Sequence, residues 1–137
     1  MLFKKNKKED QDKNFVKIAS LLIHAAKIDE NFSKTEEKII TEALLKLGAK
    51  KESLESIIKA GKLMEENANQ ILDFTREVKN MDENKKIQII ETLWQIIYSN
   101  KEADIYETNL MRRLAGLLYV DNKTMGDIKE KIKKENS

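Results

Sequence analysis

A chain of 137 residues and 15.9 kDa has room for one domain with its own hydrophobic core, and two independent enzymatic domains would not fit. Proline is absent, glycine occurs four times, and 40% apolar with 36% charged residues is typical of long amphipathic helices. Because many short strands need turn residues that this chain lacks, the composition excludes an all-β fold. With no cysteine and one histidine, disulfides, thiol catalysis and zinc fingers are excluded as well.

The net charge of +2 is unevenly distributed along the chain. Residues 1–13 and 129–137 hold nine lysines and five acids, so the two ends carry about +4 and the body about −2. Arg76, Arg112 and Arg113 are the only arginines, although arginine is the residue that reads guanine edges and clamps phosphates. We therefore expect no nucleic-acid partner.

The N-terminus and the apolar runs predict where the protein works. Residues 1–5 are basic, but the charged residues that follow leave no apolar stretch of the kind found in a secretory signal. No apolar run approaches the roughly 18 residues of a membrane span. We expect a cytoplasmic protein without a transmembrane segment. Peripheral contact of the lysines at 4–8 with the inner membrane surface is an alternative to a solvated tail.

The first half of the chain predicts four helices. Residues 15–26 are apolar on nearly every side, which predicts an enclosed helix over about 13–28. Ser33 followed by Glu36 fits a capping box, and Gly48 stands where a left-handed cap residue is expected, so the next helix ends near residue 47. Two more helices are indicated by the apolar residues Leu54, Ile57, Ile58 and Leu63 and by Ile71, Phe74, Thr75 and Val78. Their boundaries are placed near Gly61 and residues 67–69.

The second half predicts three helices. The segment from Ile87 to Ile97 is apolar on most sides and predicts a second enclosed helix over about 83–99. Asp104 followed by Glu107 resembles a capping box for a sixth helix, and Asp121 caps a seventh. Gly116, inside the sixth helix, costs about 1 kcal/mol relative to alanine. We interpret it as a site of close packing between helices, with a ligand as the alternative.

An internal repeat relates the two enclosed helices and the capped helices that follow them. Placing residue 29 over residue 100, a displacement of 71 residues, aligns enclosed helix with enclosed helix and cap with cap. The fold prediction is therefore an all-α, single-domain bundle of about seven helices with a pseudo-two-fold repeat of helical hairpins. We divide the chain into a basic flexible N-terminal tail (1–13) and a helical domain (14–134).

The repeated pattern resembles a known family. A helix ends in an Ala-x-x-Asp-like segment, an apolar residue follows three positions after the Asp, and then Ser or Asp precedes Glu by three residues. This pattern is similar to that of TerB-like domains, found in tellurite-resistance proteins and at the N-terminus of some membrane-associated J-domain co-chaperones. The family usually has Asp-Gly in the loop, whereas this chain has Asp29-Glu30 and Asn100-Lys101. The resemblance implies a bacterial stress-response module that binds or scaffolds, with no known reaction and with acidic loops as a candidate cation site.

The candidate metal site consists of four carboxylates, Asp29, Glu36, Asp104 and Glu107. Carboxylate oxygens suit a hard divalent cation such as Ca²⁺ or Mg²⁺, and Glu37, His24 or Asn100 could add a ligand. Because the second loop has Asn100 and Lys101 where acids would hold a cation, we expect weak binding, and we expect no organic cofactor. The alternative is that Glu36 and Glu107 belong to helix caps, each contributing about 1 kcal/mol, and that Asp29 bonds loop amides.

Other chemistry-bearing residues are interpreted as part of the core. His24 lies in an apolar helix, where a core position is the first interpretation and a proton or metal site with Asp29 the second. Four aromatic residues occur at helical spacing in apolar segments and are expected to pack in the core of the bundle: Phe15, Phe74, Trp94 and Tyr98. No catalytic residue is assigned.

We therefore predict a cytoplasmic interaction or scaffold module, not an enzyme, that recruits a protein partner in a stress complex, either free or at the membrane. Two alternatives stay open. One is a metal-dependent hydrolase that uses clustered carboxylates, which would need several of them in one pocket. The other is a homodimeric structural bundle, which would need an exposed apolar stripe.

Overall fold

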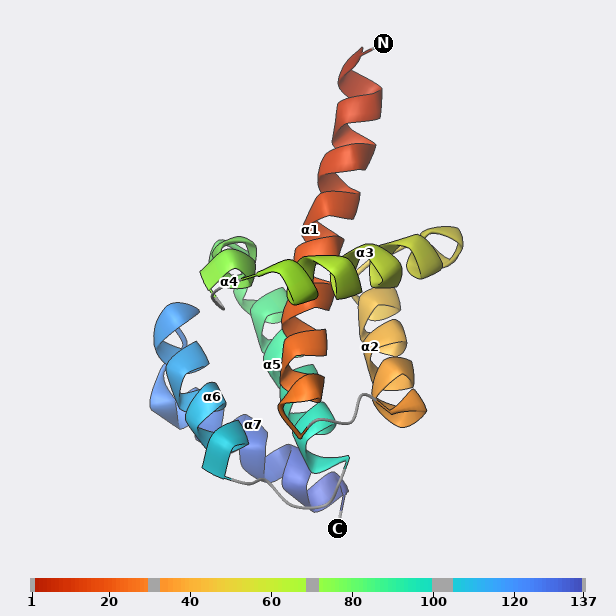
Figure 1. Ribbon diagram of the computed structural model, residues 1–137. Helices are drawn as coiled ribbons and strands as arrows, with labels where there is room; N and C mark the ends of the chain where they lie inside the picture. Colours follow the sequence, from red (N-terminus) through yellow and green to blue (C-terminus); the bar gives the residue numbers. More distant parts are fainter. Residues whose placement is uncertain (1, 30–32, 69–71, 100–104, 137) are drawn as a thin grey trace.

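The computed structural model describes residues 2–29, 33–68, 72–99 and 105–136 (Figure 1). Within these ranges the chain forms seven α-helices, two short 3-10 helices and no strand. The elements are α1 (Leu2–Ala26), η1 (Lys27–Asp29), α2 (Lys34–Lys46), η2 (Lys51–Ser53), α3 (Leu54–Asn67), α4 (Leu72–Lys79), α5 (Glu83–Tyr98), α6 (Ile105–Leu117) and α7 (Asn122–Glu135). The predicted all-α bundle is confirmed.

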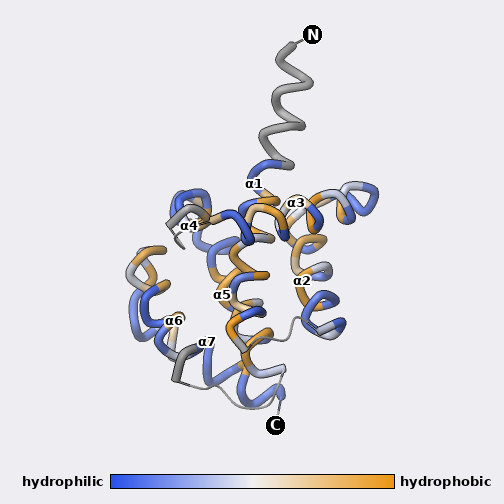
Figure 2. The backbone as a smooth tube through the Cα atoms, in the orientation of Figure 1, coloured by the Kyte–Doolittle hydropathy of each residue, from blue (hydrophilic) through white to orange (hydrophobic). Residues whose placement is uncertain are grey.

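Helices α1 and α5 form the centre of the bundle. Helix α1 packs on α2, α3, α4 and α5, and α5 packs on α1, α2 and α7. In Figure 1, α3 crosses in front of α1, α2 stands on one side and α6 on the other, and α7 runs across the lower end of the bundle. Hydrophobic residues gather along α1 and α5 in Figure 2, and Leu21, Leu22, Ile89 and Leu93 are all fully buried. The two helices predicted to be enclosed are therefore the core helices, and hydrophobic burial on this scale is the main stabilising term.

Local capping interactions fix the helix ends where the sequence predicted them. The Ser33 hydroxyl accepts from the Glu36 amide at 3.2 Å, and Glu36 Oε1 accepts from the Ser33 amide at 2.9 Å. Asp82 accepts from the Lys85 amide at 2.9 Å at the start of α5, and Asp121 accepts from the Thr124 amide at 2.7 Å at the start of α7. Each cap satisfies an amide that the helix leaves without a carbonyl partner.

Two expectations about the helices are wrong. Helix α1 begins at Leu2 and not near residue 13, since its first turns lack glycine and proline and are rich in lysine, a good helix former. Gly61 is not a boundary, because α3 runs through it to Asn67. Leu63, one of the apolar residues that indicated α3, lies in this helix but is 54% exposed. The division into a tail (1–13) and a domain (14–134) stays a prediction.

The close helix approach lies at Gly61 and not at Gly116. A Cβ at Gly61 would lie 3.0 Å from the Ala19 Cβ and 3.4 Å from the Ser20 amide nitrogen, so only glycine lets α3 approach α1 this closely. The Ser20 hydroxyl donates to the Gly61 carbonyl at 3.1 Å across the same contact. At Gly116 nothing lies within 4 Å of such an atom, so the packing interpretation of this glycine is wrong.

Helices α2 and α6 share their length and the pattern of backbone hydrogen bonds at their ends. Both helices have 13 residues, and they begin at residues 34 and 105, which is the predicted displacement. Each ends in three backbone hydrogen bonds of one pattern: Leu47 to Ala43, Gly48 to Leu45 and Ala49 to Leu44 in the first, and Leu118 to Leu114, Tyr119 to Gly116 and Val120 to Ala115 in the second. The spatial two-fold relation between the hairpins stays a prediction.

Candidate functional site

The predicted acidic residues divide into two that the structure describes and two that it does not. Glu36 and Glu107 lie in the first turns of α2 and α6, and they are buried with exposed fractions of 2% and 5%. Asp29 ends η1, and its side chain lies outside the described part of the protein, as does the whole of Asp104. The four-carboxylate site therefore stays a prediction.

Glu36 has the capping role that was its alternative interpretation. Its Oε1 accepts from the Ser33 amide and from the Ser33 hydroxyl, both at 2.9 Å. These bonds hold the carboxylate against the positive end of α2, where the helix dipole favours a negative charge. The next residue, Glu37, instead lies 3.8 Å from Lys62 Nζ of α3.

Glu107 belongs to an acidic region around Tyr98, the last residue of α5. Burial of the Tyr98 phenol raises its pKa above the usual 10.0, and the negative charges of Glu130 and Glu107 raise it further. Carboxylates from α6 and α7 thus lie close enough to act on one buried hydroxyl.

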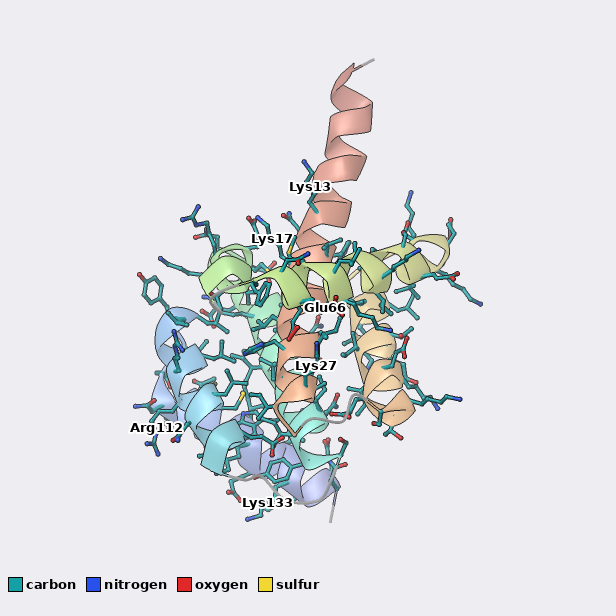
Figure 3. The ribbon with its side chains drawn as sticks, viewed as in Figure 1. Lys13, Lys17, Lys27, Glu66, Arg112 and Lys133 are labelled. Atoms are coloured by element: carbon teal, nitrogen blue, oxygen red, sulfur yellow. The ribbon has the colours of Figure 1, made fainter. Side chains whose placement is uncertain are left out.

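No group of three or more histidine, aspartate or glutamate side chains gathers as a metal site within the residues that the structure describes. His24 is not a fully buried core residue, since its side chain is 36% exposed. Its Nδ1 lies 3.6 Å from Glu65 Oε1 on α3, and Lys27 Nζ lies 3.1 Å from the other oxygen of the same carboxylate. Lys27, labelled in Figure 3, is the first residue of η1, directly after α1. The histidine therefore lies beside the Lys27–Glu65 ion pair, between α1 and α3.

The aromatic residues pack the bundle as predicted, although Phe15 is only partly buried. Trp94 is 3% exposed and stacks on Tyr98 with a centroid distance of 5.9 Å, and Lys129 Nζ lies 5.5 Å from its ring centroid. Beside Trp94 is a pocket of about 150 Å³ that includes Arg112, a side chain directed outward from α6 in Figure 3. This volume is below the range of typical ligand sites, so we assign it no ligand.

A larger pocket between α4 and α6 was missed by sequence reasoning. It has a volume of about 310 Å³ and is lined by Thr75, Arg76, Lys79, Gly116, Leu117 and Tyr119. Gly116 was the only feature that pointed to it, through the alternative of a nearby ligand. Leu117 follows Gly116 at the end of α6 and Tyr119 lies just beyond it, whereas the other lining residues lie on α4, about 40 positions earlier. No sequence motif joins the two groups.

Two further findings bear on function. No helix in the described ranges is both long and apolar enough to span a bilayer. The exposed large hydrophobic residues in the same ranges are Leu45, Leu63 and Tyr119, and they lie in three different parts of the chain.

Comparison with known proteins gives one family: its model, described as tellurite resistance protein TerB, matches residues 15–130. No curated protein and no solved structure matches the chain significantly.

Proposed function

The chain belongs to the TerB family of tellurite resistance proteins, and from this premise we propose that it is a binding module of a bacterial stress response and not an enzyme. In this proposal the acidic face beside the starts of α2 and α6 recruits a protein partner in the cytoplasm. A divalent cation, Ca²⁺ or Mg²⁺, binds weakly at the same face through Asp29, Glu36, Asp104 and Glu107.

The burial of Glu36 and Glu107, at 2% and 5% exposure, carries the proposal. Burying a carboxylate lowers the stability of the fold unless hydrogen bonds or opposite charges compensate it. Two buried carboxylates at a displacement of 71 residues are therefore more than a chance feature of the fold. Each follows a loop that carries an aspartate, and four carboxylates would supply the oxygen ligands that a hard cation prefers. Asn100 and Lys101 lower the negative charge of the second loop, which is why the expected affinity is weak.

Binding is favoured over the hydrolase alternative by the position of His24. Metal-assisted hydrolysis needs a general base or metal-bound water aimed into a pocket. The single histidine of the chain instead lies beside Glu65 and Lys27 at the contact of α1 with α3. The homodimeric bundle is the remaining alternative, and sedimentation equilibrium would report it directly as a doubled mass.

Calorimetric titration of the metal-free protein with Ca²⁺ and Mg²⁺ tests the cation site. We expect saturable heat with a Kd on the order of 10⁻⁴–10⁻³ M, the range of weak calcium modules. The double variant Asp29→Asn with Asp104→Asn should abolish this heat, since each substitution removes a charged ligand. A matched control is Asp82→Asn with Asp121→Asn, which removes the same charge at the caps of α5 and α7. Asparagine also caps helices well, so all variants should keep their helicity. Saturable binding heat of unchanged size in the Asp29→Asn/Asp104→Asn variant would rule the cation site out.

Growth in the presence of tellurite tests the stress role. Cells that express the chain should tolerate more tellurite than cells without it, and the Asp29→Asn/Asp104→Asn variant should lose this advantage while Asp82→Asn/Asp121→Asn keeps it. Equal tolerance with and without the chain would contradict a role in tellurite resistance. Equal protection by both variants would show that the acidic loops are not the acting face.

A further inference from the structure

The pocket between α4 and α6 lies at the other end of α6 from Glu107. Gly116 and Tyr119, which line it, are at the C-terminal end of α6, whereas Glu107 is in the first turn. At 1.5 Å per residue, Glu107 and Gly116 are separated by about 14 Å along the helix. The volume of about 310 Å³ falls within the range of small-molecule sites.

The charge of this pocket is positive. Arg76 and Lys79 are three residues apart on α4, so they share one face of the helix. Glu77, the acid between them, forms an ion pair with Lys17 of α1 at 2.8 Å and is thereby directed to another neighbour. In the part of the chain that the structure describes, neither Arg76 nor Lys79 has a carboxylate partner. Two cations that have no carboxylate partner among the described residues favour an anionic ligand in the pocket beside them.

Gly116 opens the pocket at the cost of local helix stability. An added Cβ would meet nothing within 4 Å, so neither packing nor backbone conformation requires a glycine here. Its counterpart in the first repeat is Leu45, an exposed residue of α2. A glycine inside a helix is unfavourable, and this one leaves the α6 side of the pocket without a side chain, opposite Arg76 and Lys79.

Tyr119 provides an exposed ring at the rim. Its φ is 57°, in the left-handed region where a large side chain is strained, and its counterpart Gly48 has the residue type usual at this position. Tyr119 is 69% exposed, and Lys79 Nζ lies 4.5 Å from the centroid of its ring. Gly116 and Tyr119 are thus less favourable for local stability than Leu45 and Gly48 at the corresponding positions of α2. Both residues line the same pocket.

From this arrangement we propose that the pocket binds a small phosphate ester. The phosphate lies between the Arg76 guanidinium and the Lys79 ammonium, and the flat organic part lies over Gly116 against the Tyr119 ring. A phosphate monoester carries close to two negative charges at neutral pH and matches two cations, whereas a carboxylate matches one. The ring of Tyr119 and the apolar surface of Leu117 suit a planar group on the ester.

Calorimetric or NMR titration of the full chain with adenosine monophosphate as probe tests the proposal, with inorganic phosphate, adenosine and benzoate as comparison ligands. We expect saturable binding of adenosine monophosphate, weaker binding of inorganic phosphate and no measurable binding of adenosine. If adenosine binds with the same affinity as adenosine monophosphate, the proposed role of the two cations is wrong. If benzoate binds with the same affinity as adenosine monophosphate, the pocket is a carboxylate site and the phosphate assignment is wrong. Absence of saturable binding for both phosphates would overturn the proposal as a whole.

Two variants with matched controls locate the binding. Arg76→Gln with Lys79→Gln should weaken adenosine monophosphate binding at least about tenfold, as expected when charge-assisted hydrogen bonds are lost. Arg112→Gln with Lys123→Gln removes the same charge outside this pocket and should change the affinity less than about twofold. Gly116→Leu should block the pocket, while Gly126→Leu, at another open glycine inside a helix, should not. Equal affinity in each variant and its control would overturn the assignment.

This inference is independent of the proposed cation site. The Asp29→Asn/Asp104→Asn variant should bind adenosine monophosphate like the unmodified chain, and Arg76→Gln/Lys79→Gln should keep its calcium or magnesium heat. Loss of both activities in both variants would point to a folding defect and overturn the separate assignments.

Discussion

At the end of α2 the chain turns through Gly48, and at the equivalent end of α6 it turns through Tyr119. Both turns use the same three backbone hydrogen bonds, and both residues have positive φ, 110° and 57°. Their surroundings differ. A pocket of about 290 Å³ beside Gly48 is lined by Phe15, Ile18, Leu47 and Met81 together with Asn14 and Lys85, whereas the pocket of about 310 Å³ beside Tyr119 contains Arg76 and Lys79.

This difference distinguishes a backbone requirement of the turn from the choice of the side chain at that position. The hydrogen bonds that end a helix involve only backbone atoms, so they form with either residue at the left-handed position. Glycine is the low-energy choice, and it stands where the neighbours are mostly apolar. A strained tyrosine stands where the neighbours are cationic, which is the pattern expected when a surface is used for binding and not for stability alone.

The largest expected effect tests whether the two capped helices share one core. Ile40 and Met111 are equivalent and almost fully buried. Replacing Ile40 with alanine should lower the free energy of unfolding by about 3–4 kcal/mol, since it removes buried methylenes and leaves a cavity. Met111→Ala should cost less, about 2–3 kcal/mol, because neighbours of a flexible side chain repack more easily. Urea unfolding measures both, and a loss below about 1 kcal/mol at either position would contradict equal enclosure.

The next effect tests the turn at Gly48. Gly48→Val should lower stability by about 2 kcal/mol, because a β-branched residue is strained at φ of 110° whatever space surrounds it. Gly126→Val is the matched control, since that helical glycine is open and the substitution should be neutral or slightly stabilising. Equal losses at the two positions in thermal unfolding would show that the backbone conformation is not the cause.

A smaller effect tests the open glycine of α6. Gly116→Ala should stabilise the protein by about 1 kcal/mol, since alanine is the better helix former and its methyl group meets no neighbour. The mirror substitution in the first repeat, Leu45→Gly, should destabilise by about 1 kcal/mol. Denaturant midpoints of both variants measure the pair. A loss of stability for Gly116→Ala would mean that this position is more crowded than the structure indicates.

The smallest expected effect is a pH dependence centred on Tyr98, whose counterpart in the first repeat is the exposed Lys27. Burial and the charges of Glu130 and Glu107 raise the phenol pKa in the folded protein above 10.0. Above pH 10 the unfolded chain therefore loses the Tyr98 proton before the folded chain does, so this residue makes stability fall as pH rises. The decline should be shallower in Tyr98→Phe, as measured by urea unfolding between pH 9 and 11. Identical slopes would contradict the shifted pKa.

Much of the fold was predictable because its determinants are local. The Ser33–Glu36 capping box, the cap at Asp121 and the left-handed Gly48 each involve residues within five positions of one another. The enclosed helices were predictable from apolar residues on all sides. The start of α1 was not, because its charged first turns have helix propensity without a periodic apolar face.

The candidate sites were less accessible to prediction. Glu36 and Glu107 were found because the repeat places them at equivalent positions, but their burial depends on packing that sequence spacing does not reveal. His24 was expected in the core and instead reaches Glu65 at the helix surface, since a residue in an apolar run can still lie on its outer edge.

By itself the sequence determined an all-α chain, its seven helices, most of their ends and its two core helices, because caps and apolar periodicity act within a few residues. Only the tertiary structure decided which glycine permits close packing. Gly61 faces Ala19 across the crossing of α1 and α3, while Gly116 faces open space. It also decided that Arg76 and Lys79 meet Tyr119 in one pocket, because that meeting depends on how α4 packs against α6 and on no local preference of either helix.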